Sequence, residues 1–127
     1  MRALAIIGVL TLAGCTQGEP PAPAAAVKQE RPVAVMERVA RRVQACWYKT
    51  PRRALKGTRL AAELDSYSGR PRILIVPRNR PTGLPKIVAE ARTVGGSTRF
   101  EAYGPLLDRT LESDLNRWAR GGSACTA

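Results

Sequence analysis

The first strong pattern along the chain is an apolar stripe at the spacing of an amphipathic helix. The stripe consists of Met36, Val39, Ala40, Val43 and Trp47. Glu and Arg side chains fall on the opposite side of the same pattern. Since every third or fourth residue of a helix lies on one face, this spacing predicts a helix over residues 33–47 with its apolar side buried.

A second helical pattern lies near the end of the chain. Its apolar residues are Leu111, Leu115 and Trp118. We expect Thr110 to cap the helix N-terminus, because its hydroxyl can accept a hydrogen bond from a free amide of the first turn. Glu112 and Asp114 would then lie in the first turn, where the helix dipole favours negative charge. Gly121 is expected to end the helix.

Between these helices, apolar residues alternate with polar ones, as in strands with one buried face. The alternating stretches are residues 58–64, 72–76, 86–92 and 98–103. Residues 72–76 are nearly all apolar, so we place them in the centre of the sheet. The pattern of 86–92 fits a strand or a helix, and we favour a strand because Gly95 and Gly96 supply a tight turn into the next one.

The order of these elements predicts an α+β fold. We expect an N-terminal helix, a four-stranded, mostly antiparallel sheet made of two hairpins, and a C-terminal helix, with both helices on one face of the sheet. The length of 127 residues fits one domain, and an apolar content of 44% is ordinary for a folded protein. The domain is expected to occupy residues 33–127.

The N-terminus has a different pattern. Arg2 precedes an uninterrupted run of apolar and small residues from 3 to 14, apart from one Thr. The run is too short for a membrane-spanning helix, which needs about 20 residues. It has the length of the hydrophobic region of a signal peptide.

That run leads into Leu12-Ala13-Gly14-Cys15, which resembles the lipobox of bacterial prolipoproteins. The resemblance implies that residues 1–14 are a signal peptide, cut before Cys15, and that the Cys15 thiol receives a diacylglyceryl group. The new amine is usually acylated, and two or three chains hold a protein firmly in a membrane. Thr16 lacks the Asp that retains such proteins in the inner membrane, so the resemblance favours the outer membrane, facing the periplasm. The alternatives are an ordinary secretory signal and a short buried helix.

Residues 15–32 comprise that cysteine and a stretch rich in Pro and Ala. Such a composition prefers extended conformations and buries little. We interpret it as a tether that holds the domain off the membrane by at most about 50 Å. A tail that is cleaved or disordered would have nearly the same sequence.

Two further cysteines, Cys46 and Cys125, lie at the end of the first predicted helix and just past the last one. In an exported protein such a pair predicts a disulfide. A redox pair or a metal site is the alternative. There is no C-x-x-C motif and no His, so we expect neither a metal nor another cofactor.

A second resemblance rests on Cys46-Trp47-Tyr48, the stretch 63–72, the stretch 103–107, and Trp118 with Cys125. These segments are similar to a group of small alphaproteobacterial envelope proteins, a likeness that brings no known activity. The Cys-Trp pair followed by strands is also loosely similar to the C-terminal domains of the TolA and TonB proteins. That likeness implies a protein-contact domain that offers a sheet edge, although the second hairpin replaces a helix of those domains.

Charge adds a candidate function. The chain has 21 Lys and Arg against 10 Asp and Glu, for a net charge of +11, which favours anionic partners. In the envelope these are lipopolysaccharide phosphates, phospholipid headgroups or an acidic protein. The candidate anion-binding residues are Arg38, Arg41, Arg42, Arg70, Arg72, Arg78 and Arg80. A solvated basic surface is the alternative, and an aromatic content of 5% gives no stacking platform for nucleic acid.

Catalysis has little support. The absence of His excludes Ser-His and Cys-His nucleophiles. Ser-Lys chemistry would need one of Ser66, Ser68 and Ser97, and turn formation explains these serines. We therefore expect no catalytic residues, and a lipid-anchored envelope protein that acts as a non-enzymatic binding or structural module. A TolA/TonB-like protein-contact domain and an electrostatic binder of anionic lipid or polysaccharide are the alternatives.

Overall fold

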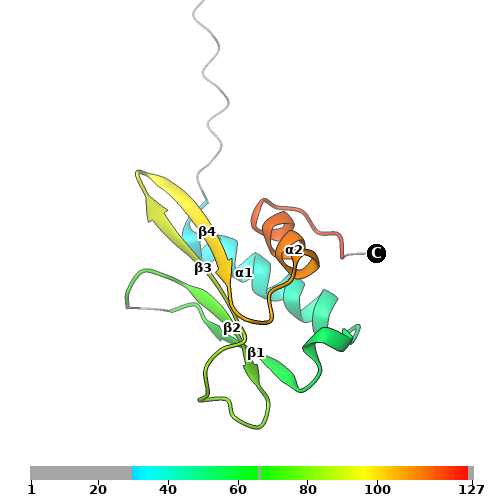
Figure 1. Ribbon diagram of the computed structural model, residues 1–127. Helices are drawn as coiled ribbons and strands as arrows, with labels where there is room; N and C mark the ends of the chain where they lie inside the picture. Colours follow the sequence, from blue (N-terminus) through cyan, green and yellow to red (C-terminus); the bar gives the residue numbers. More distant parts are fainter. Residues whose placement is uncertain (1–29, 66, 126–127) are drawn as a thin grey trace, which may run out of the picture.

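The computed structural model describes residues 30–65 and 67–125. These residues form two layers, a four-stranded sheet and a pair of helices on one of its faces (Figure 1). The elements are α1 (Pro32–Val43), β1 (Thr58–Glu63), β2 (Arg72–Pro77), β3 (Ile87–Val94), β4 (Ser97–Tyr103) and α2 (Arg109–Ala119). The predicted α+β class and the order of helices and strands are confirmed.

The sheet has the strand order β1-β2-β3-β4, and each strand runs antiparallel to its neighbours. β2 is an interior strand, as its apolar sequence predicts, and the ambiguous stretch after residue 86 is strand β3. The register pairs Ile73 with Ala89 and Ile75 with Ile87. All four side chains are buried, so this face of the sheet is the one that the helices cover.

The core joins that face to the apolar stripes of both helices. The predicted stripe residues Met36, Val39 and Val43 are fully buried, as are Leu111 and Leu115 of α2. The rings of Trp47 and Trp118 meet with centroids 5.5 Å apart, an arrangement typical of stable aromatic pairs. The helical spacing in the sequence therefore identified the buried sides of α1 and α2.

The ends of the helices differ from the predictions. The N-cap of α2 is Asp108, whose carboxylate accepts a hydrogen bond from the Leu111 amide at 2.8 Å. The prediction of Thr110 is wrong, since Thr110 already lies inside the helix. α1 ends at Val43 and continues as a π-helical turn, Gln44–Tyr48. π-helical turns are rare and often lie at functional sites.

No helix within residues 30–65 and 67–125 has the length and apolar character needed to cross a membrane. The predicted signal peptide, the lipidated Cys15 and most of the predicted tether lie outside the residues that the structure describes. Glu30 is described, and its carbonyl oxygen accepts a hydrogen bond from the Thr98 hydroxyl at the β3–β4 hairpin. The chain thus enters the domain at the hairpin end of the sheet.

Gly104, directly after β4, provides a stability prediction. Its φ is 138°, and an added Cβ would lie 2.8 Å from the Ile87 Cα and closer still to the Lys86 carbonyl oxygen. Backbone strain and overpacking together are expected to make Gly104→Ala lower the free energy of unfolding by about 2–5 kcal/mol. Urea denaturation measures the loss.

Gly57→Ala is the matched control, because Gly57 has a φ of 78° but open space around it. This variant has only the backbone strain, which should lower the free energy of unfolding by about 1–2 kcal/mol. Equal losses for the two variants would contradict the close approach.

Candidate functional site

A hollow of about 680 Å³ opens at the end of the sheet where β1 begins and β2 ends. Its apolar wall is formed by Trp47, Tyr48, Pro51 and Leu55. Its cationic side chains are Arg52, Arg53, Lys56 and Arg78. The turn at Gly57 and Thr58 completes the wall. We name this hollow the cationic pocket.

The segment between α1 and β1 shapes the cationic pocket. Pro51 follows the π-helical turn and cannot continue a helix, because its nitrogen has no hydrogen to donate. A short 3-10 turn, Arg53–Leu55, and the left-handed Gly57 then redirect the chain into β1. These consecutive bends place several basic side chains around one concavity.

All the charged side chains that line the pocket are positive. Two arginines and one lysine come from residues 52–56, Arg78 comes from the end of β2, and no acidic side chain lines the wall. A concave surface with cations of this density concentrates anions near it. Arg suits carboxylate and phosphate in particular, because its planar fork donates two parallel hydrogen bonds.

A chain of hydroxyl groups braces one side of the pocket. The Thr58 hydroxyl donates to the Leu55 carbonyl oxygen at 2.6 Å and lies 2.9 Å from the Tyr48 hydroxyl. Since Thr58 has one proton and gives it to Leu55, Tyr48 must donate to Thr58. Burial raises the pKa of Tyr48, against smaller opposing effects of Thr58 and Arg78. The phenol therefore keeps its proton, and this donor, throughout the physiological pH range.

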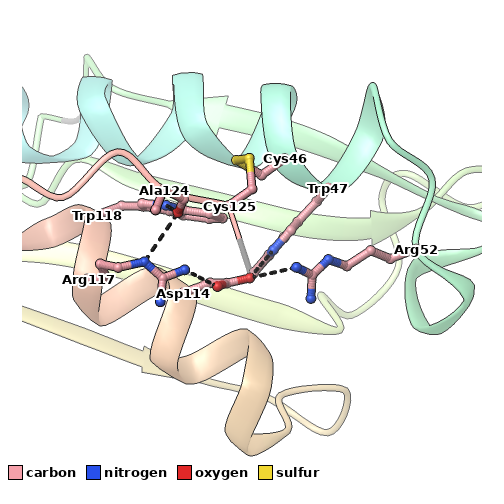
Figure 2. The surroundings of a disulfide bond; sticks show 8 residues. All are labelled: Cys46, Trp47, Arg52, Asp114, Arg117, Trp118, Ala124 and Cys125. Atoms are coloured by element: carbon pink, nitrogen blue, oxygen red, sulfur yellow. Dashed lines mark hydrogen bonds and ion pairs between the residues drawn. A yellow bond between two sulfur atoms is a disulfide. The ribbon is translucent and has the colours of Figure 1, made fainter. Parts of the chain in front are cut away.

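Arg52 is held from behind by the carboxylate of Asp114, a residue of α2 with no exposed surface. Arg52 forms an ion pair with Asp114 at 3.1 Å, and the Trp47 indole donates to the same carboxylate at 3.0 Å. Arg117 forms a further ion pair with it (Figure 2). The carboxylate thus joins α2 to both the apolar and the cationic wall of the pocket. The predicted position of Asp114 in the first turn of the helix is wrong, because α2 begins at Arg109 and only Glu112 is an acidic residue of its first turn.

The disulfide lies beside this network. Cys46 and Cys125 are bonded, with Cα atoms 5.3 Å apart, a normal separation for a disulfide. The carbonyl oxygen of Ala124 accepts hydrogen bonds from the Trp118 indole at 2.9 Å and from Arg117 at 3.2 Å (Figure 2). The segment after α2 is therefore fixed next to Trp47, which is a core residue as predicted.

The seven predicted arginines form two groups along the chain, Arg38, Arg41 and Arg42 on α1 and then Arg70, Arg72, Arg78 and Arg80 around β2. In the first group Arg38 has a structural role. Its guanidinium donates to the carbonyl oxygens of Trp118 and Ala119 at 2.8 and 2.6 Å, and it pairs with Glu30. These bonds satisfy the C-terminal end of α2, so the guanidinium of Arg38 is already bonded within the protein. Arg41 is exposed, Arg42 is partly buried, and neither lines the cationic pocket.

The second predicted group does not come together in space. Arg72 projects from the uncovered face of the sheet and pairs with Glu63 at 2.5 Å. That hydrogen bond raises the pKa of Arg72 above its ordinary value. Arg70 and Arg80 are exposed near opposite ends of β2. Arg78 is the one member of the seven predicted arginines that lines the cationic pocket.

Comparison with protein-family models, with curated proteins and with solved structures finds no match for this chain. Residues 30–65 and 67–125 hold no group of three or more His, Cys, Asp or Glu side chains placed to bind a metal. Ser-Lys chemistry would need a serine beside a lysine such as Lys56 or Lys86, but Ser97 lies at the hairpin end of the sheet and these lysines lie near its opposite end.

Proposed function

We propose that this protein is a lipid-anchored, non-enzymatic module of the bacterial cell envelope that binds an anionic envelope component in the cationic pocket. The lipobox-like sequence at Cys15 supports the anchor and an outer-membrane location facing the periplasm. The observation that carries the binding role is the convergence of Arg52, Arg53, Lys56 and Arg78 on one hollow without a carboxylate in its wall.

One of the four cations is fixed in place, because Arg52 is held at the pocket wall by an ion pair with the buried Asp114. Arg53, Lys56 and Arg78 are exposed around the same hollow. The cost of holding like charges together is recovered when an anion binds between them. A preformed, braced wall also lowers the entropy lost on binding.

The anchor gives the first functional prediction. Cys15→Ala removes the thiol that would receive the lipid, so we expect the protein to be lost from the membrane fraction or to stay unprocessed. Fractionation of cells followed by detection of the chain measures this. Thr16→Ala is the matched control and should fractionate as the original protein does. Unchanged membrane association of Cys15→Ala would contradict the proposed anchor.

The cationic pocket gives the second functional prediction. Titration of the isotope-labelled protein with inorganic phosphate should shift the amide signals of residues 52–58 and 78. Arg78→Gln should weaken this binding about tenfold, because it removes one charge-assisted hydrogen bond. Added salt should weaken it as well, since ions screen exposed charges.

Arg41→Gln is the matched control, because Arg41 is exposed and outside the pocket. It should leave the phosphate titration unchanged. Shifts that are distributed over all the arginines, or that Arg78→Gln does not reduce, would contradict the cationic pocket as an anion site.

The second candidate is a TolA/TonB-like protein-contact domain. β1 and β4 each pair with one strand within the described residues, so each has an edge at which a partner strand could add. Photo-crosslinking residues introduced along these two edges test this in intact cells. Adducts confined to alternate positions of one edge would support strand addition, and adducts at neither edge would exclude it.

A further inference from the structure

We propose that the ligand of the cationic pocket is a single anionic amphiphile, a phosphate group joined to an alkyl or acyl chain. The phosphate would bind at Arg53, Lys56 and Arg78, and the chain would lie on the apolar wall. This inference rests on the proposed anion-binding function and names the chemistry of its ligand.

The first argument is the size and composition of the pocket. A volume of about 680 Å³ is typical of sites for organic ligands and far exceeds the size of a phosphate ion. Beside its cations the pocket is lined by apolar residues, of which Tyr48 is partly exposed and Pro51 is exposed. The cations can bind a phosphate group, and this apolar surface can contact a hydrocarbon chain attached to it.

The second argument is a neighbouring hollow of about 310 Å³ on the other side of the turn at residues 56–58. It shares Lys56, Gly57 and Thr58 with the cationic pocket and adds Pro77, Pro105 and Leu106 as apolar lining. Its other cation is Lys86. Each of the two hollows thus has both apolar and cationic lining and they share one turn, and an amphiphile has the matching pattern of charge and apolar surface.

The third argument is an exposed apolar side chain in the loop from β2 to β3, at the same end of the sheet. Leu84 has 88% of its surface exposed, and the loop around it carries Arg80 and Lys86. Exposing a leucine to water is unfavourable. A bound alkyl chain that extends from the second hollow past Lys86 would cover part of the Leu84 side chain.

The position of the pocket favours one captured molecule over a bilayer. The chain enters the domain near Thr98, at the hairpin end of the sheet, and the pocket lies at the opposite end. A concave site at the end of the domain opposite to the chain entry suits a single ligand molecule that has been removed from a membrane.

The experiment uses the chain from residue 15 onward with Cys15→Ser and three probes: dodecyl phosphate below its micelle-forming concentration, inorganic phosphate, and dodecyl maltoside. Binding is followed by amide shifts and calorimetry. Dodecyl phosphate should bind at least about 100-fold more tightly than phosphate, since burying a few methylene groups gives this factor. Dodecyl maltoside should bind far more weakly than dodecyl phosphate, because it has no charge.

Two variants distinguish the binding of the phosphate group from the binding of the alkyl chain. Arg78→Gln should weaken phosphate and dodecyl phosphate by the same factor. Leu106→Ser should weaken dodecyl phosphate several-fold and leave phosphate unchanged. Arg53→Gln, at an exposed position, replaces Arg78→Gln if that variant does not fold, and Arg41→Gln is the control for both.

Each outcome decides the question. Equal affinities for phosphate and dodecyl phosphate would overturn the amphiphile and leave the anion site standing. No pocket shifts with either compound would overturn both proposals. Binding to vesicles of anionic phospholipid, without binding of monomeric dodecyl phosphate, would overturn the single-molecule ligand in favour of membrane docking.

Discussion

Asp114→Ala is expected to lower the free energy of unfolding by about 3–5 kcal/mol, because it removes one side of a buried ion pair. Asp114 has no exposed surface, and its carboxylate is bound by Trp47, Arg52 and Arg117. The alanine variant leaves an indole N–H and two guanidinium groups without this acceptor. Urea denaturation followed by tryptophan fluorescence measures the loss.

Glu112→Ala is the matched control, since Glu112 is an exposed acidic residue of the same helix. It should change the free energy of unfolding by no more than about 0.5 kcal/mol. A loss below about 1 kcal/mol for Asp114→Ala would show that the carboxylate contributes little.

Removal of the disulfide is expected to have an effect of similar size. The bond joins residues separated by 79 positions, and a closed loop of this length reduces the entropy of the unfolded chain. The double variant Cys46→Ala/Cys125→Ala should be less stable by about 2–5 kcal/mol. Thermal and urea denaturation under oxidising conditions measure the difference.

The control is reduction of the original protein with a thiol reagent. The reduced protein should have the stability of the double variant, and Cys15→Ala should match the oxidised protein. The variant should keep its fold if its remaining stability suffices, because Trp118 and Arg117 still bind the Ala124 carbonyl oxygen. Equal stability of the double variant and the oxidised protein would contradict a stabilising disulfide.

Periodicity in the sequence predicted most of the fold, because the burial of a face imposes its spacing on each helix and strand. The Gly95-Gly96 turn settled the ambiguous third strand. The cap of α2 was not predictable from residue type, since Asp108 and Thr110 are both good N-cap residues. Only the position of the Leu111 amide relative to each side chain decides between them.

Tertiary contacts explain the wrong predictions for charged residues. A helical projection puts Arg38 on the solvent side of α1, but it cannot show that the last carbonyls of α2 lie within its reach. Likewise the sequence does not show that Asp114 faces Trp47 and Arg52 across the interface between elements. Arg38 joins segments about 80 positions apart along the chain, and Asp114 joins segments about 60 positions apart.

The cationic pocket was missed for a related reason. Arg52, Arg53 and Lys56 lie in an irregular stretch with no apolar period, so no predicted helix or strand places them. A signal was present in the dense run of basic residues around Pro51. That such a run surrounds a hollow depends on how the chain bends before β1, which local sequence does not specify.

The disulfide also determines how the domain would bear mechanical load. Residues 47–124 lie inside the covalent loop that Cys46 and Cys125 close, and this loop contains the entire sheet and α2. Tension applied between the point where the chain enters and the far end of the described chain passes along α1 and through the sulfur–sulfur bond. The strands are outside this path. A module pulled between a membrane and a distant partner would therefore carry the load along α1 and the disulfide, and its strands would bear no direct tension while that bond is intact.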